Sequence, residues 1–214
     1  MALFQRKKSP PATSGVKLHI GSGKHRLEGW VNVDIQDIPG VDVVADVTDG
    51  LDFKHVQAVY AEHFLEHLEI GDAIDFLLEC RRVLSDDGWL RLSTPNLDWV
   101  WSTHLPPHLE GEEKQLATIR ANRAFYGWRH RFLWTREFLH RALEACGFDE
   151  IAWFRYGASG REVFQGLERH ETYTDTEDLP HVLVVEARRG KVRKAELKAL
   201  RQTLQDEFWM HMAD

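Results

Sequence analysis

Short apolar runs that end at glycine or acidic residues dominate the first part of the chain. They predict strands over four stretches of sequence, at residues 16–20, 30–34, 41–46 and 56–61. The same pattern predicts further strands at residues 89–93, 151–156 and 181–187. Near-continuous apolar runs of this length are typical of a parallel sheet that is covered on both faces.

Apolar residues at helical spacing predict the remaining elements. The pattern is strong from Glu66 to Leu84, is present near residues 110–125, and returns as an apolar stripe along residues 191–214. Thr135 is a suitable N-cap, and Gly147 a suitable stop, for one more helix between them. Residues 85–88 read as a turn. Strands that alternate with helices indicate an α/β domain with a mostly parallel sheet.

The pattern divides the chain into a flexible N-terminal tail (1–15), a main domain (16–190) and a C-terminal amphipathic helix (191–214). Residues 95–134 hold four tryptophans, and we interpret them as an insertion or lid outside the sheet. The connections at residues 24–29 and 36–40 are too short for a helix, so one sheet face is expected to lack helices. We expect either the C-terminal helix or a second copy of the chain, as a homodimer, to cover that face.

Composition narrows the class of protein. With 214 residues, 43% of them apolar and 29% charged, the chain is expected to form one ordinary globular domain. No apolar run approaches the roughly 18 residues that span a bilayer, and the start lacks the apolar region of a secretory signal. The two cysteines have no metal-binding spacing, so a cytoplasmic location is expected. The net charge of −7 makes a nucleic-acid partner an unfavoured expectation.

Gly21-Ser22-Gly23 follows the first predicted strand, and glycine lets a backbone approach a ligand closely. Two phosphate-binding patterns fail here. A dinucleotide fingerprint requires glycine where the chain has Arg26, and a Walker loop requires serine or threonine where it has His25. The glycine turn therefore predicts a ligand other than a nucleoside phosphate.

Acidic residues end the next two predicted strands. The carboxylate of Asp34 is placed to accept hydrogen bonds from a ribose diol, and that of Asp46 from an exocyclic amine. Ligands of open α/β sheets bind at the carboxyl ends of the strands. We therefore expect the glycine turn, both aspartates and His63 along one edge of the sheet.

Six motifs in order resemble those of class I S-adenosylmethionine-dependent methyltransferases, above all a small bacterial branch with the first motif GsG…GWxNvD. They cover about residues 16–189 and read LHIGSGKHRLEGWVNVD, DVVADVTD, VYAEHFLEHL, ECRRVLSDDGWLRLSTPN, HRFLWTREFLHRALEACGF and HVLVVEAR. In that branch the first crossover is shortened, which agrees with the short connection noted above. The resemblance implies a three-layer Rossmann-like fold with a mostly parallel seven-stranded sheet whose last strand is antiparallel.

The resemblance also implies S-adenosyl-L-methionine as cofactor and assigns residues to it. Gly21, Ser22 and Gly23 would lie along its methionine and ribose, and Asp34, with Ile35 beside it, would hold the ribose hydroxyls. Asp46 and Val47 would hold the adenine. Glu62 and His63 would lie near the sulfonium and the methyl acceptor.

Three histidines are candidate catalytic residues, because a hydroxyl acceptor benefits from a general base that works near neutral pH. His63 is the first candidate, His67 lies one turn further on, and His130 belongs to the insertion. The histidines and aromatic residues favour O-methylation of a sugar or other small hydroxylated molecule, a small-molecule or glycan acceptor. A nucleic-acid methyltransferase is the alternative within this class.

Two alternatives lie outside the class. His63, Glu66 and His67 match the H-x-x-E-H pattern of some zinc hydrolases. That pattern requires a helix, whereas Val59–Ala61 just before it reads as a strand, so no metal ligand is expected. The chain could also be a non-catalytic module that binds a partner through its C-terminal amphipathic helix.

Overall fold

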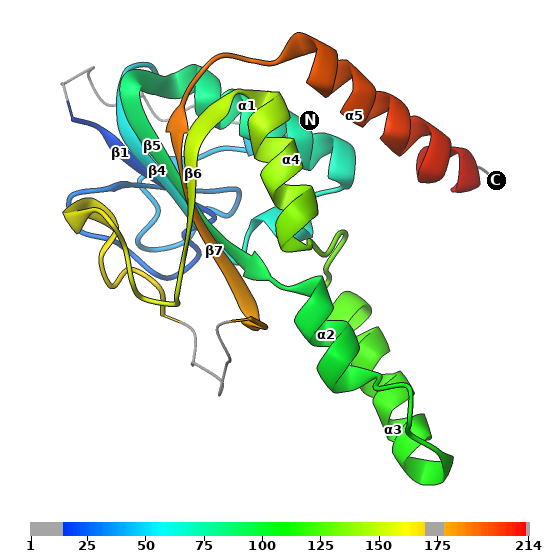
Figure 1. Ribbon diagram of the computed structural model, residues 1–214. Helices are drawn as coiled ribbons and strands as arrows, with labels where there is room; N and C mark the ends of the chain where they lie inside the picture. Colours follow the sequence, from blue (N-terminus) through cyan, green and yellow to red (C-terminus); the bar gives the residue numbers. More distant parts are fainter. Residues whose placement is uncertain (1–14, 170–177, 213–214) are drawn as a thin grey trace, which may run out of the picture.

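The computed structural model describes residues 15–169 and 178–212, and its centre is one seven-stranded sheet (Figure 1). The strand order is β3-β2-β1-β4-β5-β7-β6. The strands span β1 Lys17–Ile20, β2 Val31–Asp34, β3 Val43–Val44, β4 Val56–Glu62, β5 Leu84–Pro95, β6 Phe148–Phe154 and β7 Val182–Arg189. β1 to β5 pair in parallel, whereas β7 is antiparallel to both of its neighbours. The expected α/β fold, with a mostly parallel sheet and an antiparallel last strand, is confirmed.

Helices cover one face of this sheet. They are α1 Ile70–Val83, α4 Arg136–Cys146 and α5 Lys194–Glu207, and their apolar sides share one core with the sheet. The predicted caps of α4 are present: the Phe138 backbone N–H donates to Thr135 Oγ1 over 3.2 Å, and Gly147 is left-handed with φ 91°. None of the described helices is long and apolar enough to cross a bilayer.

Loops cover the other face, because both early crossovers lack a helix. A second apolar cluster lies there, formed by Leu27, Trp30, Ala58, Tyr60 and Phe164. The C-terminal helix does not contribute to it. Instead, α5 packs against α4 and buries Leu200 and Leu204 in the first core. The expectation that this helix covers the helix-free face is therefore wrong, and cover by a second copy of the chain stays a prediction.

The buried side chain of Asn32 fixes the first crossover, residues 21–30, which contains no helix. The Leu27 backbone N–H donates to Asn32 Oδ1 over 2.8 Å, and Asn32 Nδ2 donates to the carbonyls of Leu27 and Trp30, both over 3.1 Å. The same Nδ2 lies 2.9 Å from Asp42 Oδ2, at the end of the second crossover. Asn32 therefore bonds both short crossovers to β2. These bonds fix the backbone that follows the glycine turn at the end of β1.

Three predicted elements differ from the structure. Helix α1 begins at Ile70 rather than Glu66, because residues Leu65–His67 form a separate 3-10 helix. The predicted turn at 85–88 is a bulge within β5: Leu84 pairs with Val56 and Trp89 with Ala58, so the residues between them have no opposite partners. Strand β3 is only two residues long.

Residues 97–127 form a helical arm that projects away from the sheet (Figure 1). It consists of α2 Leu97–His104, α3 Gly111–Asn122 and a π-helical turn over Arg123–Gly127. A β-bridge between Asn96 and Trp134 joins its two ends. The arm therefore leaves the main domain and returns to it at the same place, beside the carboxyl end of β5.

Candidate active site

The glycine turn and Asp34 meet at the carboxyl ends of β1 and β2. The Gly23 backbone N–H donates to Asp34 Oδ2 over 2.8 Å, and the Gln36 N–H donates to Oδ1 over 2.9 Å. Gly21 and Gly23 have φ values of 64° and 52°, in the left-handed region that favours glycine. A Cβ on Gly21 would lie 2.4 Å from Phe64 Cδ2, whereas a Cβ on Gly23 would meet nothing within 4 Å. The turn thus presents an open backbone surface next to a carboxylate.

Ser22 and Ile35 show that this edge suits a ligand with both polar and apolar parts. The Ser22 hydroxyl is buried and has no hydrogen-bond partner among the described residues. Buried polar atoms normally have a partner, so this hydroxyl is placed to bond a ligand group. Ile35 directly follows β2 and is 61% exposed, so a large apolar side chain borders the edge next to the glycine turn. Both features fit a bound nucleoside at this edge.

Asp46 ends the β3 region and caps the 3-10 helix Val47–Asp49. Its Oδ1 accepts from the Thr48 backbone N–H over 2.9 Å and from the Thr48 hydroxyl over 2.6 Å. Val47, the next residue in the chain, is buried. Asp46 therefore has a structural partner in addition to its predicted role, and its Oδ2 is the atom that would face a ligand amine.

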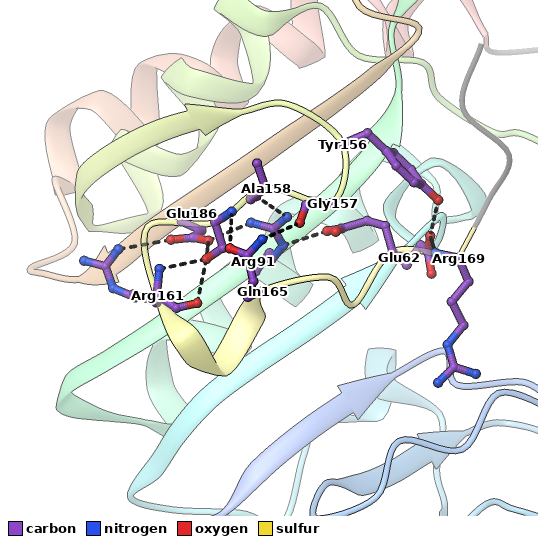
Figure 2. A network of polar contacts seen from close by, with 11 residues as sticks. Glu62, Arg91, Tyr156, Gly157, Ala158, Arg161, Gln165, Arg169 and Glu186 are labelled. Atoms are coloured by element: carbon purple, nitrogen blue, oxygen red, sulfur yellow. Dashed lines mark hydrogen bonds and ion pairs between the residues drawn. The ribbon is translucent and has the colours of Figure 1, made fainter.

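Glu62, the last residue of β4, is held by the loop that follows β6. Its Oε1 accepts from the Tyr156 hydroxyl over 3.1 Å and from the Arg169 backbone N–H over 2.9 Å (Figure 2). Because both partners belong to one loop on the helix-free face, the position of this carboxylate depends on how that loop is anchored.

A buried ionic network anchors the loop (Figure 2). Arg91 of β5 is fully buried and bonds Glu168 and Glu186 over 2.6 Å each, as well as the Ala158 carbonyl over 2.8 Å. Glu186 also pairs with Arg161 over 3.0 Å. Two guanidinium groups and two carboxylates thus balance one another between the sheet and the loop.

His63 lies just beyond β4 with φ 45°, a conformation that is uncommon for residues other than glycine. Its Nδ1 is 3.1 Å from Glu66 Oε1, and the Thr94 hydroxyl donates to Glu66 Oε2 over 3.0 Å. Burial by itself would raise the pKa of Glu66, but the hydrogen bond and charge of His63 outweigh it and lower that pKa. The buried carboxylate therefore fixes the orientation of the His63 ring.

The other two candidate histidines lie next to each other. The His67 and His130 ring centroids are 5.2 Å apart, and His67 Nδ1 is 3.4 Å from the Arg129 carbonyl. Burial lowers the pKa of His130, so its neutral form is favoured. The structure therefore gathers all three predicted histidines around Glu66, although His130 is far from the others in sequence.

These histidines line a cavity of about 640 Å³ between the main domain and the base of the helical arm. We call it the arm pocket. Two tryptophans and five histidines dominate its lining, which consists of His63, Glu66, His67, Pro95, Trp99, Val100, His104, Arg123, Trp128, His130, His181 and Val182. The volume falls within the range of roughly 300–1,000 Å³ that is usual for small-molecule sites.

The geometry disfavours the zinc-hydrolase alternative. His63 precedes the 3-10 helix Leu65–His67, so His63 and His67 do not lie one turn apart on an α-helix. Glu66, the general base of such a hydrolase, is instead fully buried and bonded to His63 and Thr94.

Sequence patterns missed several residues that shape this site. Asn32 belongs to the GWVNVD motif, but only the fold shows that its amide ties the two crossovers together. Tyr156 and Arg91 carried no signal, because their partners lie far away in sequence. The sequence did contain a signal for the start of helix α2. Asn96 is its N-cap and accepts from the Asp98 backbone N–H, and Asp98 lies in the first turn.

Known proteins share this fold. The structure of a SAM-dependent methyltransferase from Archaeoglobus fulgidus has a TM-score of 0.53 and 18% identity, over 82% of this chain and 86% of that one. A protein from Thermotoga maritima, described as a "SAM-dependent methyltransferase, possible histamine N-methyltransferase", has a TM-score of 0.51 and 16% identity, over 84% of each chain. No curated protein sequence matches the chain.

A sequence-family model described as "Methyltransferase domain" matches residues 7–152, more than half of the chain. The matched segment contains the glycine turn, Asp34, Asp46 and the three histidines. The chain therefore belongs to the methyltransferase-domain family and is an S-adenosylmethionine-dependent methyltransferase.

Proposed function

We propose that the protein transfers the methyl group of S-adenosylmethionine to a hydroxyl of a sugar or other small hydroxylated molecule bound in the arm pocket. The observation that carries this proposal is the position of His63, which lies at the end of β4 and also lines that pocket. The helix-free first crossover supports membership of the bacterial branch with the GsG…GWxNvD motif.

The cofactor half of the site rests on the carboxyl ends of β1, β2 and β3. The Gly23 backbone and the Ser22 hydroxyl would contact the methionine and ribose, and Asp34 would accept hydrogen bonds from the ribose diol. Ile35, Asp46 and Val47 would border the adenine. Bound S-adenosylmethionine supplies an activated methyl group, and these residues would fix its direction toward β4.

The acceptor half is small and aromatic. Trp99 and Trp128 line the pocket, and aromatic faces suit the apolar faces of sugar rings. Arg123 lies 5.6 Å from the Trp128 ring centroid and brings a positive charge for an acceptor that carries an anionic group. A pocket of this size favours a small molecule over a nucleic-acid duplex.

Transfer to oxygen forms an O–CH₃ bond as the S–CH₃ bond breaks, and the hydroxyl proton must leave. With Nδ1–H donated to Glu66, Nε2 is the basic nitrogen of His63 and the proposed acceptor of that proton. Glu66 and Thr94 then act as positioning residues, because they hold the imidazole without touching the acceptor.

Methyl transfer should be screened against sugars, nucleotide sugars and a single-stranded oligonucleotide, by following S-adenosylhomocysteine formation. Turnover on a sugar supports the proposal. Turnover on the oligonucleotide alone would replace it with the nucleic-acid alternative.

For the acceptor found in that screen, Trp128→Ala is expected to raise KM by about 2- to 12-fold, since stacking on an aromatic ring is worth about 0.5–1.5 kcal/mol. Trp101→Ala is the matched control. Trp101 and Trp128 are each 52% exposed, but Trp101 does not line the pocket. Equal KM changes in both variants would contradict an acceptor site in the arm pocket.

A further inference from the structure

The sequence predicts no metal ligand, yet folding brings together three groups that suit one. Glu66, His67 and His130 each offer a ligand atom, and these atoms lie within 4.8 Å of one another. We propose that these residues form a binding site for a divalent transition-metal ion of the zinc type, in the wall of the arm pocket.

The backbone holds the two contributing segments in this register. The Glu66 carbonyl accepts from the Arg131 N–H over 2.7 Å and from the Phe132 N–H over 3.3 Å. The His130 N–H in turn donates to the Phe125 carbonyl over 2.8 Å. His130 therefore stands beside the 3-10 helix that carries Glu66 and His67 because main-chain bonds place it there.

The negative charge of the buried Glu66 side chain also favours a bound cation. Its side chain is fully buried, and among the described residues it forms no ion pair with lysine or arginine. Its surroundings are imidazoles: His63, His67 and His130. Buried carboxylates are normally paired with a cation or coordinate a metal, and a divalent ion between Glu66 and the two further histidines would add a permanent positive charge to a carboxylate whose charged neighbours are imidazoles only.

The donor set has the right chemistry. Two imidazoles and one carboxylate leave open positions on zinc or iron(II). His67 Nδ1 already faces the Arg129 carbonyl, which leaves Nε2 for the metal in the arrangement that metal-bound histidines favour. Bonds of about 2.0–2.2 Å require ligand atoms roughly 3.5 Å apart, so the side chains must close by about 1 Å, a small rotation for the exposed His67.

The role of the ion, but not its binding, rests on the proposed function. An acceptor hydroxyl oxygen would take an open metal position, which lowers its pKa. Its proton would pass to His63 Nε2, the oxygen would form the bond to the methyl carbon, and the sulfonium would leave as a neutral thioether. Each atom and charge is thereby accounted for.

Metal binding is tested on the tag-free, full-length protein after chelator treatment and desalting. Zn²⁺ is titrated by calorimetry, and Co²⁺ by its visible absorption. One ion per chain is expected, with affinity lowered by roughly 100-fold or more in His67→Ala and in His130→Asn, since even partners of ligands are worth 10–100-fold. His104→Ala is the control, because His104 lines the same pocket outside the cluster. Thermal melting of each variant shows whether it is folded.

Absence of stoichiometric binding, or binding that survives in both ligand variants, would overturn the metal site. S-adenosylhomocysteine is titrated into the same samples without metal. Binding there, combined with no metal binding, removes the metal inference and leaves the proposed function intact; loss of both removes the proposed function as well.

Discussion

Replacing Arg91 by alanine is expected to lower the free energy of unfolding by about 3–5 kcal/mol. Arg91 is fully buried and compensates Glu168 and Glu186, so its removal leaves Glu168 without a paired cation and Glu186 with Arg161 alone. Urea unfolding followed by circular dichroism measures the change. Because the same network anchors the loop that holds Glu62, the variant is also expected to bind S-adenosylhomocysteine more weakly.

Two comparisons isolate the cause. Adding Glu168→Gln and Glu186→Gln to the Arg91→Ala background removes the stranded charges and should restore part of the lost stability. Arg188→Ala breaks an ion pair with Glu150 in which both side chains are largely exposed, and should cost less than about 1 kcal/mol. A loss in Arg91→Ala no larger than that of Arg188→Ala would contradict the proposed importance of the buried network.

His63→Ala is expected to lower kcat about 10²–10⁴-fold, the usual scale for removing a general base. The Kd for S-adenosylhomocysteine should change little, because the contacts proposed for the nucleoside belong to β1, β2 and β3. The measurement pairs steady-state turnover on the identified acceptor with calorimetry. His108→Ala, which removes an exposed histidine outside the arm pocket, is the control for kcat.

A purely structural His63 would give another result. Its loss would then alter melting temperature and cofactor affinity together with kcat, because the buried Glu66 carboxylate would lose its imidazole partner just beyond β4. An unchanged kcat in a folded His63→Ala variant would exclude it as the base and direct attention to His130.

The fold was accessible from the sequence because the first-motif turn and the parallel strands are local patterns. Gly21–Gly23, Asp34 and Asp46 each follow a short apolar run, and parallel strands place their carboxyl ends together. The caps of α4 at Thr135 and Gly147 were readable for the same reason, since capping depends on neighbouring residues.

What the sequence could not supply depends on contacts between distant segments. His130 joins Glu66 through the main chain of residues 131 and 132, across the whole helical arm. Arg91 meets Glu168 and Glu186 through strand pairing and a long loop. The cover of the helix-free face also depends on a distant segment. The short crossovers predicted that this face would lack helices, but not that the loop carrying Phe164 would cover it.

The most direct test of the account is a titration of S-adenosylhomocysteine into the wild-type protein and into Asp34→Ala, with Glu28→Ala as control. Glu28 is an exposed acid in the same crossover. Two charge-assisted hydrogen bonds to the ribose diol are worth about 3 kcal/mol, so the Kd should rise about 100-fold in Asp34→Ala and stay unchanged in Glu28→Ala. Asp34→Ala also loses its bonds to Gly23 and Gln36, so its folded state is checked by thermal melting. Equal affinity in all three folded proteins, or no binding to the wild type, would contradict a cofactor site at the glycine turn.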